Sequence, residues 1–181
     1  MTNEAQEQVV LVDEQDRDVG LMEKIQAHEE GKLHRAFSVF VFRTKNGEPE
    51  LLLQERAVSK YHFGGLWTNT TCGHPRKGET PVQAGERRLS EEMGFTLPLQ
   101  AVGSFMYFAK WDNGLAEHEL DHVVVARVPD VDVKPNPDEA DGYRWITIDA
   151  LDQELEQQAE RFTPWFFKAY PLARAWAKGE G

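Results

Sequence analysis

Residues 73–95 constrain the fold most, because they contain a helix with a recognisable beginning and end. Thr80 can accept a hydrogen bond at the N-terminus, Pro81 suits the first helical position, and Gln83 completes a capping box. Gly94 can end the helix, because glycine readily adopts the left-handed conformation found after many helices. The apolar face of this helix consists of Val82, Gly85, Leu89 and Met93. This segment predicts one amphipathic helix directly after a loop.

The rest of the chain alternates between β-rich and helical segments, without an internal repeat or a dividing linker. Strands are expected at residues 9–13, 35–43, 50–56, 101–110, 117–128 and 143–148. Further helices are expected at residues 21–28, at an acidic segment capped by Asp149, and at residues 164–178. Residues 61–78 have no clear period and are expected to form a functional loop. The pattern predicts a flexible tail over residues 1–8 and a single α/β domain over residues 9–181.

Composition excludes several classes of function. The net charge of −11 argues against nucleic-acid binding, which depends mainly on Lys and Arg. Cys72 is the one cysteine, so an internal disulfide is impossible and a reducing compartment suits the chain. The N-terminus lacks an export signal, and no apolar stretch is long enough to span a membrane. We therefore expect a cytoplasmic protein with neither a nucleic-acid nor a membrane partner.

Three carboxylates of the marked helix region, Glu79, Glu91 and Glu92, could converge on a hard cation, which prefers oxygen ligands. The alternative is a solvated acidic helix face, since runs of charge are usually exposed. The spacing favours the first interpretation, because it resembles the signature of the Nudix superfamily. The matching positions are Gly73, Glu79, Arg87, Leu89, Glu91, Glu92, Gly94 and Phe95. The resemblance implies a Nudix-type α/β (α+β) fold, with mixed β-sheets packed between helices.

One position departs from the signature: Arg88 stands where the hydrolytic members carry a metal-binding glutamate. The chain more closely resembles the type 1 isopentenyl-diphosphate isomerases, a branch of the same superfamily. The shared motifs are Trp67-Thr68-Asn69, Cys72-Gly73-His74-Pro75, Leu33-His34-Arg35-Ala36-Phe37-Ser38 and Arg87-Arg88. The resemblance extends from about Val9 to Pro164-Trp165, nearly the whole chain. It implies a 1,3-allylic isomerisation of isopentenyl diphosphate to dimethylallyl diphosphate, an early step of isoprenoid biosynthesis.

We expect His28, His34, His74, Glu117 and Glu119 to bind one divalent ion. In a strand Glu117 and Glu119 point to the same face, because side chains alternate with period two. His28 and His34 can meet only if the helix ends between them, at Gly31. A single histidine is more often structural, but three histidines with two carboxylates suit a five- or six-coordinate ion. By resemblance the ion is Mn2+, Zn2+ or Mg2+.

The resemblance also implies a Mg2+ ion that binds together with the substrate. Its protein ligands would be Glu92 and the backbone carbonyl of Cys72, and the diphosphate would supply further oxygens. Magnesium commonly binds through few protein oxygens and the phosphates of a substrate.

Moving an unactivated double bond requires a proton donor and a proton acceptor on opposite sides of the substrate. A buried cysteine is usually inert packing, but Cys72 lies in a motif-rich loop beside His74. By resemblance Glu119, paired with Tyr107, works from the opposite side. We hypothesise that Glu119 with Tyr107 protonates the terminal alkene carbon and that Cys72 removes the allylic proton. Trp165 matches a tryptophan whose ring can stabilise a carbocation, although core packing would also explain it.

Basic residues that match the family are expected to bind the diphosphate: Lys24, Arg56, Lys60, Arg87 and Arg88. Arginine can bind phosphate oxygens through two parallel hydrogen bonds, whereas lysine supplies a point charge. Arg87 and Arg88 are adjacent on one helix, so both cannot face the same ligand. One of them is expected to be a structural ion-pair partner.

Two other functions are compatible with parts of the sequence. A Nudix hydrolase acting on a nucleoside diphosphate derivative would use the helix and the metals but would leave Cys72 without a role. An inactive binding module would not need every candidate catalytic position to be filled. The sequence is compatible with a monomer or a homodimer.

Overall fold

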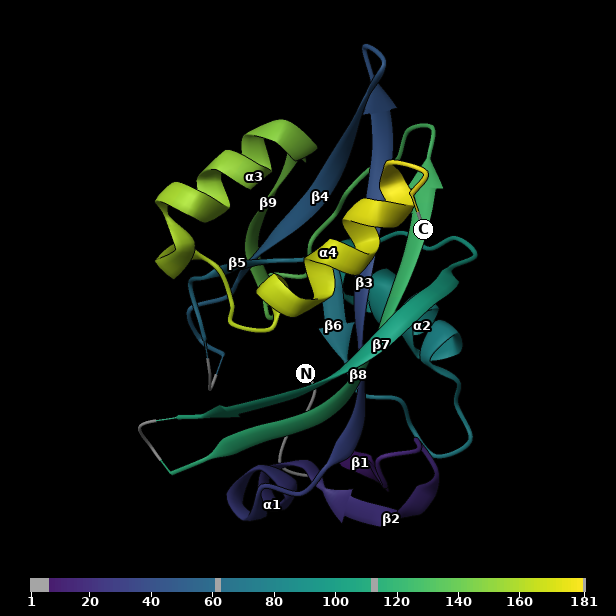
Figure 1. The fold of residues 1–181 in the computed structure, drawn as a ribbon, viewed down its shortest axis with the longest axis vertical. Helices are drawn as coiled ribbons and strands as arrows, with labels where there is room; N and C mark the ends of the chain where they lie inside the picture. Colours follow the sequence, from purple (N-terminus) through teal and green to yellow (C-terminus); the bar gives the residue numbers. More distant parts are fainter. Residues whose placement is uncertain (1–6, 61–62, 112–113, 181) are drawn as a thin grey trace.

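Strand β3 (His34–Lys45) organises the fold of the computed structural model, which describes residues 7–60, 63–111 and 114–180. β3 pairs in parallel with β8 (Ala116–Val128) along most of its length. On its other edge it pairs antiparallel with β6 (Thr71–Gly73) and then with β4 (Glu48–Arg56). β3 therefore connects all parts of a mixed, branched sheet (Figure 1).

The remaining strands extend this sheet. They are β1 (Gln8–Val12), β2 (Asp18–Glu23), β5 (Trp67–Thr68), β7 (Gln100–Lys110) and β9 (Ala140–Thr147). β1 joins β3 and β2, β7 joins β8, and β4 carries both β5 and β9. The helices are α1 (Lys24–Glu30), α2 (Pro81–Met93), α3 (Ile148–Gln157), η2 (Ala159–Arg161) and α4 (Phe166–Ala177).

Both faces of β3 are buried, which explains why its sequence is an almost continuous apolar run. Val39 and Val41 face one way and pack with the apolar side of α2. Phe40 and Phe42 face the other way and pack with α3 and α4. The sheet is thus covered by α2 on one face and by α3 and α4 on the other, as expected from the sequence. Figure 1 shows α4 crossing in front of β3.

The helix expected at residues 21–28 is shifted, and this part of the prediction is wrong. Leu21 and Met22 belong to β2, where they pair with Val10 and Val9 of β1. α1 begins only at Lys24, because the Glu23 side chain accepts hydrogen bonds from the first free amides of the helix. Pairing with β1, which local periodicity cannot reveal, decides the boundary.

Two further expectations need correction. The segment 61–78 contains the short strands β5 and β6, although residues 61 and 62 lie outside the described part. α3 is capped by Thr147, whose hydroxyl accepts a hydrogen bond from the Ala150 amide at 3.2 Å, and Asp149 lies in the first turn instead. The cap and end of α2 agree with the sequence: Thr80 and Gln83 form the capping box, and Gly94 has φ +78°.

At the N-terminus, Gln8 already belongs to β1, within the stretch expected to be a tail. None of the described helices is both long and apolar enough to cross a membrane.

Candidate active site

A cavity of about 640 Å³, counted out to its open mouth, is lined by residues of β3, β4, β6, β8 and α2 and by Trp165 at the start of α4. The sheet register places Cys72 beside Ser38 and Ala36 beside Asp121, so residues far apart in sequence line one wall. Among the residues singled out by the sequence, those lining the cavity are Lys24, Arg56, Lys60, Cys72, His74, Arg88, Glu92, Glu117, Glu119 and Trp165.

Three histidines meet beside this cavity, and one of them, His74, lines it. His28 comes from the last turn of α1, His34 from the start of β3, and His74 from the residue after β6. Their nearest ring nitrogens lie within 4.8 Å of one another, and all three side chains are buried. Gly31 ends α1 in the left-handed conformation, with φ +65°, and so allows the chain to turn between His28 and His34.

Glu119 completes this cluster. Its Oε2 atom lies 3.0 Å from His74 Nε2 and 3.5 Å from His34 Nε2. The His34 Nδ1 atom lies 2.9 Å from the Lys32 carbonyl, to which it can donate, and this leaves Nε2 directed at the cluster. Burial alone would raise the pKa of Glu119, but the interactions with His34 and His74 hold it well below its usual range. Glu119 is therefore a carboxylate at neutral pH.

The neighbouring carboxyl groups of β8 experience the opposite shift. Burial raises the pKa of Glu117 well above its usual range, and the charge of Glu119 adds to this effect. Burial and Glu119 raise the pKa of Asp121 in the same way. Burial, together with the neighbouring His74 and His34, also lowers the pKa of His28 to about 3. The protein thus concentrates imidazoles and crowded carboxyl groups, a donor set that a divalent cation would stabilise.

Cys72 lies in β6 and is half-buried. Its Sγ atom lies 3.8 Å from Arg56 Nη1, within the range of a hydrogen bond to sulfur. Burial raises the pKa of the Cys72 thiol to about 12, although the Arg56 charge acts in the opposite direction. The resting form at neutral pH is therefore the protonated thiol.

Tyr107 lies directly opposite Glu119 in the pairing of β7 with β8. It is buried, and its hydroxyl has no hydrogen-bond partner among the described residues. Tyr107 is not one of the residues that line the cavity, and no hydrogen bond joins it to Glu119 in the described part of the chain. Burial raises the pKa of Tyr107, and the nearby carboxyl groups of Glu117 and Glu119 add to this effect, so register and electrostatics both place Tyr107 near Glu119.

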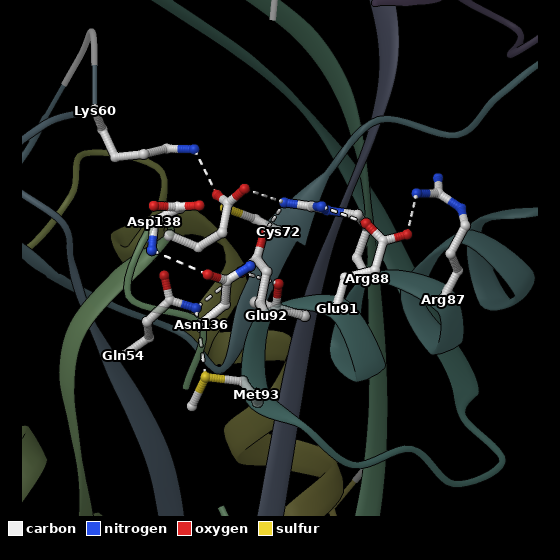
Figure 2. A network of polar contacts seen from close by, with 12 residues as sticks. Gln54, Lys60, Cys72, Arg87, Arg88, Glu91, Glu92, Met93, Asn136 and Asp138 are labelled. Atoms are coloured by element: carbon white, nitrogen blue, oxygen red, sulfur yellow. Dashed lines mark hydrogen bonds and ion pairs between the residues drawn. The ribbon is translucent and has the colours of Figure 1, made fainter. Parts of the chain in front are cut away.

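Arg88 occupies the centre of an ionic network beside the cavity (Figure 2). Its guanidinium contacts Glu91 and Glu92, each at 2.6 Å, and Glu139 at 3.3 Å. The other oxygen of Glu92 accepts hydrogen bonds from Gln54 and Thr71. A metal ion could therefore bind Glu92 only by sharing a carboxylate that protein donors already hold.

Arg87 points elsewhere. Its guanidinium binds Glu79 through two bonds of 2.8 and 2.9 Å and approaches Glu91 at 3.3 Å. Arg87 does not line the cavity. Of the two adjacent arginines, Arg87 is therefore the candidate for the structural ion-pair partner.

Trp165 closes the cavity at the N-terminus of α4. The indole Nε1 donates to Asn69 Oδ1 at 3.1 Å, and the Arg56 guanidinium carbon lies 5.4 Å from the ring centroid. The ring is 4% exposed, so it is a wall of the cavity and also part of the buried structure.

Three cavity residues were missed by the sequence analysis. Asp121 continues the alternation of Glu117 and Glu119 along β8, and this signal could have identified it. Glu139, in the loop before β9, contacts both Lys60, at 2.7 Å, and Arg88. Glu7 reaches the cavity from the N-terminus. For the last two no local pattern exists, since only tertiary folding brings them to the site.

Comparison with known proteins shows which families this chain resembles. A profile of the NUDIX domain matches residues 32–166. The chain is 52% identical to an isopentenyl-diphosphate Delta-isomerase of Photobacterium profundum over 163 residues, 89% of this chain and 91% of the relative. It is 47% identical to the isopentenyl-diphosphate Delta-isomerase of Halorhodospira halophila, over 96% of this chain and 99% of the relative.

The chain belongs to the isopentenyl-diphosphate Delta-isomerase family, within the NUDIX proteins. A third family member, from Burkholderia multivorans, is 45% identical over 95% of this chain and 98% of its own length. The resemblance read from the sequence motifs is therefore confirmed.

Solved structures confirm the Nudix fold. The protein DR0079 of Deinococcus radiodurans matches 93% of this chain and 98% of its own, with a TM-score of 0.68 and 21% identity. The NUDIX domain of Shewanella oneidensis NrtR, solved with ADP ribose, matches 78% of this chain and 85% of its own, with a TM-score of 0.61 and 16% identity. These similarities concern the fold alone.

Proposed function

We propose that this isomerase-family chain converts isopentenyl diphosphate into dimethylallyl diphosphate by protonation and deprotonation. The observation that carries the proposal is that Cys72 and Glu119 line one cavity together with a buried tryptophan and four cationic side chains. Both reacting groups can thus approach one small substrate. The reaction needs a donor, an acceptor, a surface that stabilises positive charge, and little water.

The protonation states bear on the direction of proton transfer. The sequence suggested that Glu119 with Tyr107 donates and that Cys72 accepts. The raised pKa of Cys72 and the lowered pKa of Glu119 instead favour the thiol as donor and the carboxylate as acceptor. In that direction a proton moves from Cys72 to the terminal alkene carbon, and Glu119 takes one from the allylic carbon. Trp165, whose indole face can stabilise a cation, lies against the intermediate.

The residues also fit a divalent metal ion. We propose that His28, His34, His74, Glu117 and Glu119 hold it, because three imidazoles and crowded carboxyl groups converge there. Such an ion would fix the position of Glu119 and offset the mutual repulsion of the carboxylates. Mn2+, Zn2+ and Mg2+ are all compatible with this donor set.

Charge supports a second ion bound with the substrate. The cations of the cavity lining are Lys24, Arg56, Lys60 and Arg88, whereas its carboxyl groups are Glu7, Glu92, Glu117, Glu119, Asp121 and Glu139. A diphosphate entering so acidic a site needs positive charge in addition to these four side chains. We propose Mg2+ held by Glu92 and the Cys72 carbonyl, with the four cations binding the diphosphate. Arg87 is left out of this set, because it is bound to Glu79.

At the level of the whole chain, we propose a single domain over residues 9–181 that acts in the cytoplasm on a small diphosphate. The proposal includes neither a nucleic-acid nor a membrane partner, and a monomer and a homodimer are both compatible with it.

The test is conversion of radiolabelled isopentenyl diphosphate, measured with and without EDTA. We expect turnover that EDTA abolishes and that Mg2+ together with Mn2+ or Zn2+ restores. Release of phosphate from nucleotides and sugar-nucleotides should be negligible, because Arg88 replaces a metal-binding glutamate of the hydrolases. Robust hydrolysis without isomerisation would refute the proposal.

A further inference from the structure

Glu7 reaches from the N-terminal segment into the cavity. Its backbone carbonyl accepts a hydrogen bond from the Lys24 amide at 2.7 Å, and its Oε2 atom lies 3.5 Å from Lys24 Nζ. Lys24 is the first residue of α1 and is one of the cations assigned above to the diphosphate. A carboxylate from the chain terminus is thus paired with a substrate-binding group.

The surroundings of Glu7 are those expected for an anion. Burial alone would raise the pKa of Glu7, but the charges of Lys24 and Arg88 hold it below its usual range. Both of these residues line the cavity. The Glu7 carboxylate therefore experiences the positive field in which the diphosphate is expected to bind.

We propose that Glu7 is an internal competitor of the diphosphate. Its carboxylate neutralises Lys24 while the cavity is empty and leaves Lys24 when the diphosphate enters. This inference rests on the proposed function, since it assigns a regulatory role to the same site.

The pair is built in a way that permits such an exchange. The backbone bond to Lys24 and the pairing of Gln8 with Glu23 hold the segment in place without the Glu7 side chain. The Glu7 side chain is 25% exposed, and its contact with Lys24 is long, at 3.5 Å, so this ion pair is weaker than the 2.7 Å contact between Lys60 and Glu139. Glu7 can therefore withdraw by a change of side-chain conformation.

The other carboxylates beside the cationic side chains are held more firmly. Glu92 is fixed within α2 and accepts hydrogen bonds from Gln54 and Thr71. The Glu139 carboxylate contacts Lys60 and Arg88 at once, and its backbone amide is bonded to the Asn136 carbonyl. Of Glu7, Glu92 and Glu139, Glu7 is therefore the carboxylate that needs the least free energy to be displaced from its cation.

The test is Glu7→Gln, which keeps the size of the side chain and removes its charge. Binding of inorganic pyrophosphate in the presence of Mg2+ is measured by calorimetry, and isomerisation by the radiolabel assay. We expect pyrophosphate to bind about three- to tenfold more tightly and the KM for isopentenyl diphosphate to fall by the same factor, with kcat unchanged. The gain should shrink at high salt, which screens a partly exposed charge.

Two variants serve as controls. Glu14→Gln makes the same change at an exposed position that does not line the cavity, and it should leave both constants unchanged. Glu7→Asp keeps the charge and should stay close to the parent protein. Thermal melts verify that each variant is folded.

Unchanged or weaker pyrophosphate binding by Glu7→Gln, in a preparation whose parent protein turns over, would overturn the inference. Weaker binding would assign Glu7 to the positioning of Lys24 instead. If the parent protein neither binds pyrophosphate nor isomerises, the proposed function itself fails.

Discussion

Arg56 Nη1 lies 3.8 Å from Cys72 Sγ, so the sulfur has a cation beside it although its thiol is protonated at rest. Such a cation can stabilise the thiolate left behind when the thiol gives up its proton. The pair therefore suits a group that changes protonation state during the reaction, which inert packing would not require.

Cys72→Ala should lose nearly all isomerisation, because it removes one of the two proton carriers. Pyrophosphate binding should persist, since the four cations of the cavity remain. Calorimetry and the radiolabel assay on the same preparation separate these effects. Substantial turnover by the variant would remove Cys72 from the chemistry.

The direction of proton transfer can be tested with Glu119→Gln in deuterium oxide. If Cys72 is the donor, the variant can still protonate the substrate and return a proton from the same carbon. Deuterium would then accumulate at the terminal carbon of isopentenyl diphosphate without formation of product, and mass spectrometry would detect it. Absence of exchange, in a variant shown by metal analysis to retain its ion, would favour Glu119 as the donor.

The contribution of His28 to the stability of the metal-free protein should be lost as the pH drops below about 6.5, the ordinary histidine value. The folded-state pKa of His28 is lowered to about 3, so between these values the unfolded chain binds a proton that the folded chain does not. One such group contributes a slope of about 1.4 kcal/mol per pH unit. Urea unfolding between pH 7 and pH 4 measures the slope. His28→Asn should remove about one proton from this dependence of stability on pH.

Arg87 and Arg88 offer a matched pair of substitutions. Arg88→Lys should raise the KM for the substrate about tenfold or more, because lysine cannot reproduce the forked contacts with carboxylates and phosphate. Arg87→Lys should leave the KM unchanged and cost about 1 kcal/mol of stability or less, through the weakened contact with Glu79. If Arg87→Lys raised the KM and Arg88→Lys did not, Arg87 rather than Arg88 would bind the diphosphate.

Trp165 can be tested by separating its ring from its hydrogen bond. Trp165→Phe keeps an aromatic face and loses the bond to Asn69, whereas Trp165→Leu loses both. If the ring stabilises a cation by about 2 kcal/mol, Trp165→Leu should lower kcat about 30-fold. Trp165→Phe should lower kcat much less. Equal losses in both variants would indicate a packing role.

Local sequence determined much of this protein. The capping box and closing glycine fixed α2, because those signals act within a few residues. Alternation along β8 placed Glu117 and Glu119 on one face, because that property belongs to any strand. The motifs also led to the family, and they singled out residues that line the cavity.

Tertiary structure decided the rest. Pairing with β1 turned Leu21 and Met22 into strand, overriding their helical periodicity. Only the packing of α2 against the sheet assigned Arg88 to the cavity and Arg87 to Glu79. Glu139, which entered the site through contacts between distant segments, has no local signal. Burial and neighbouring charges, which set the opposite pKa shifts of Cys72 and Glu119, exist only once the chain is folded.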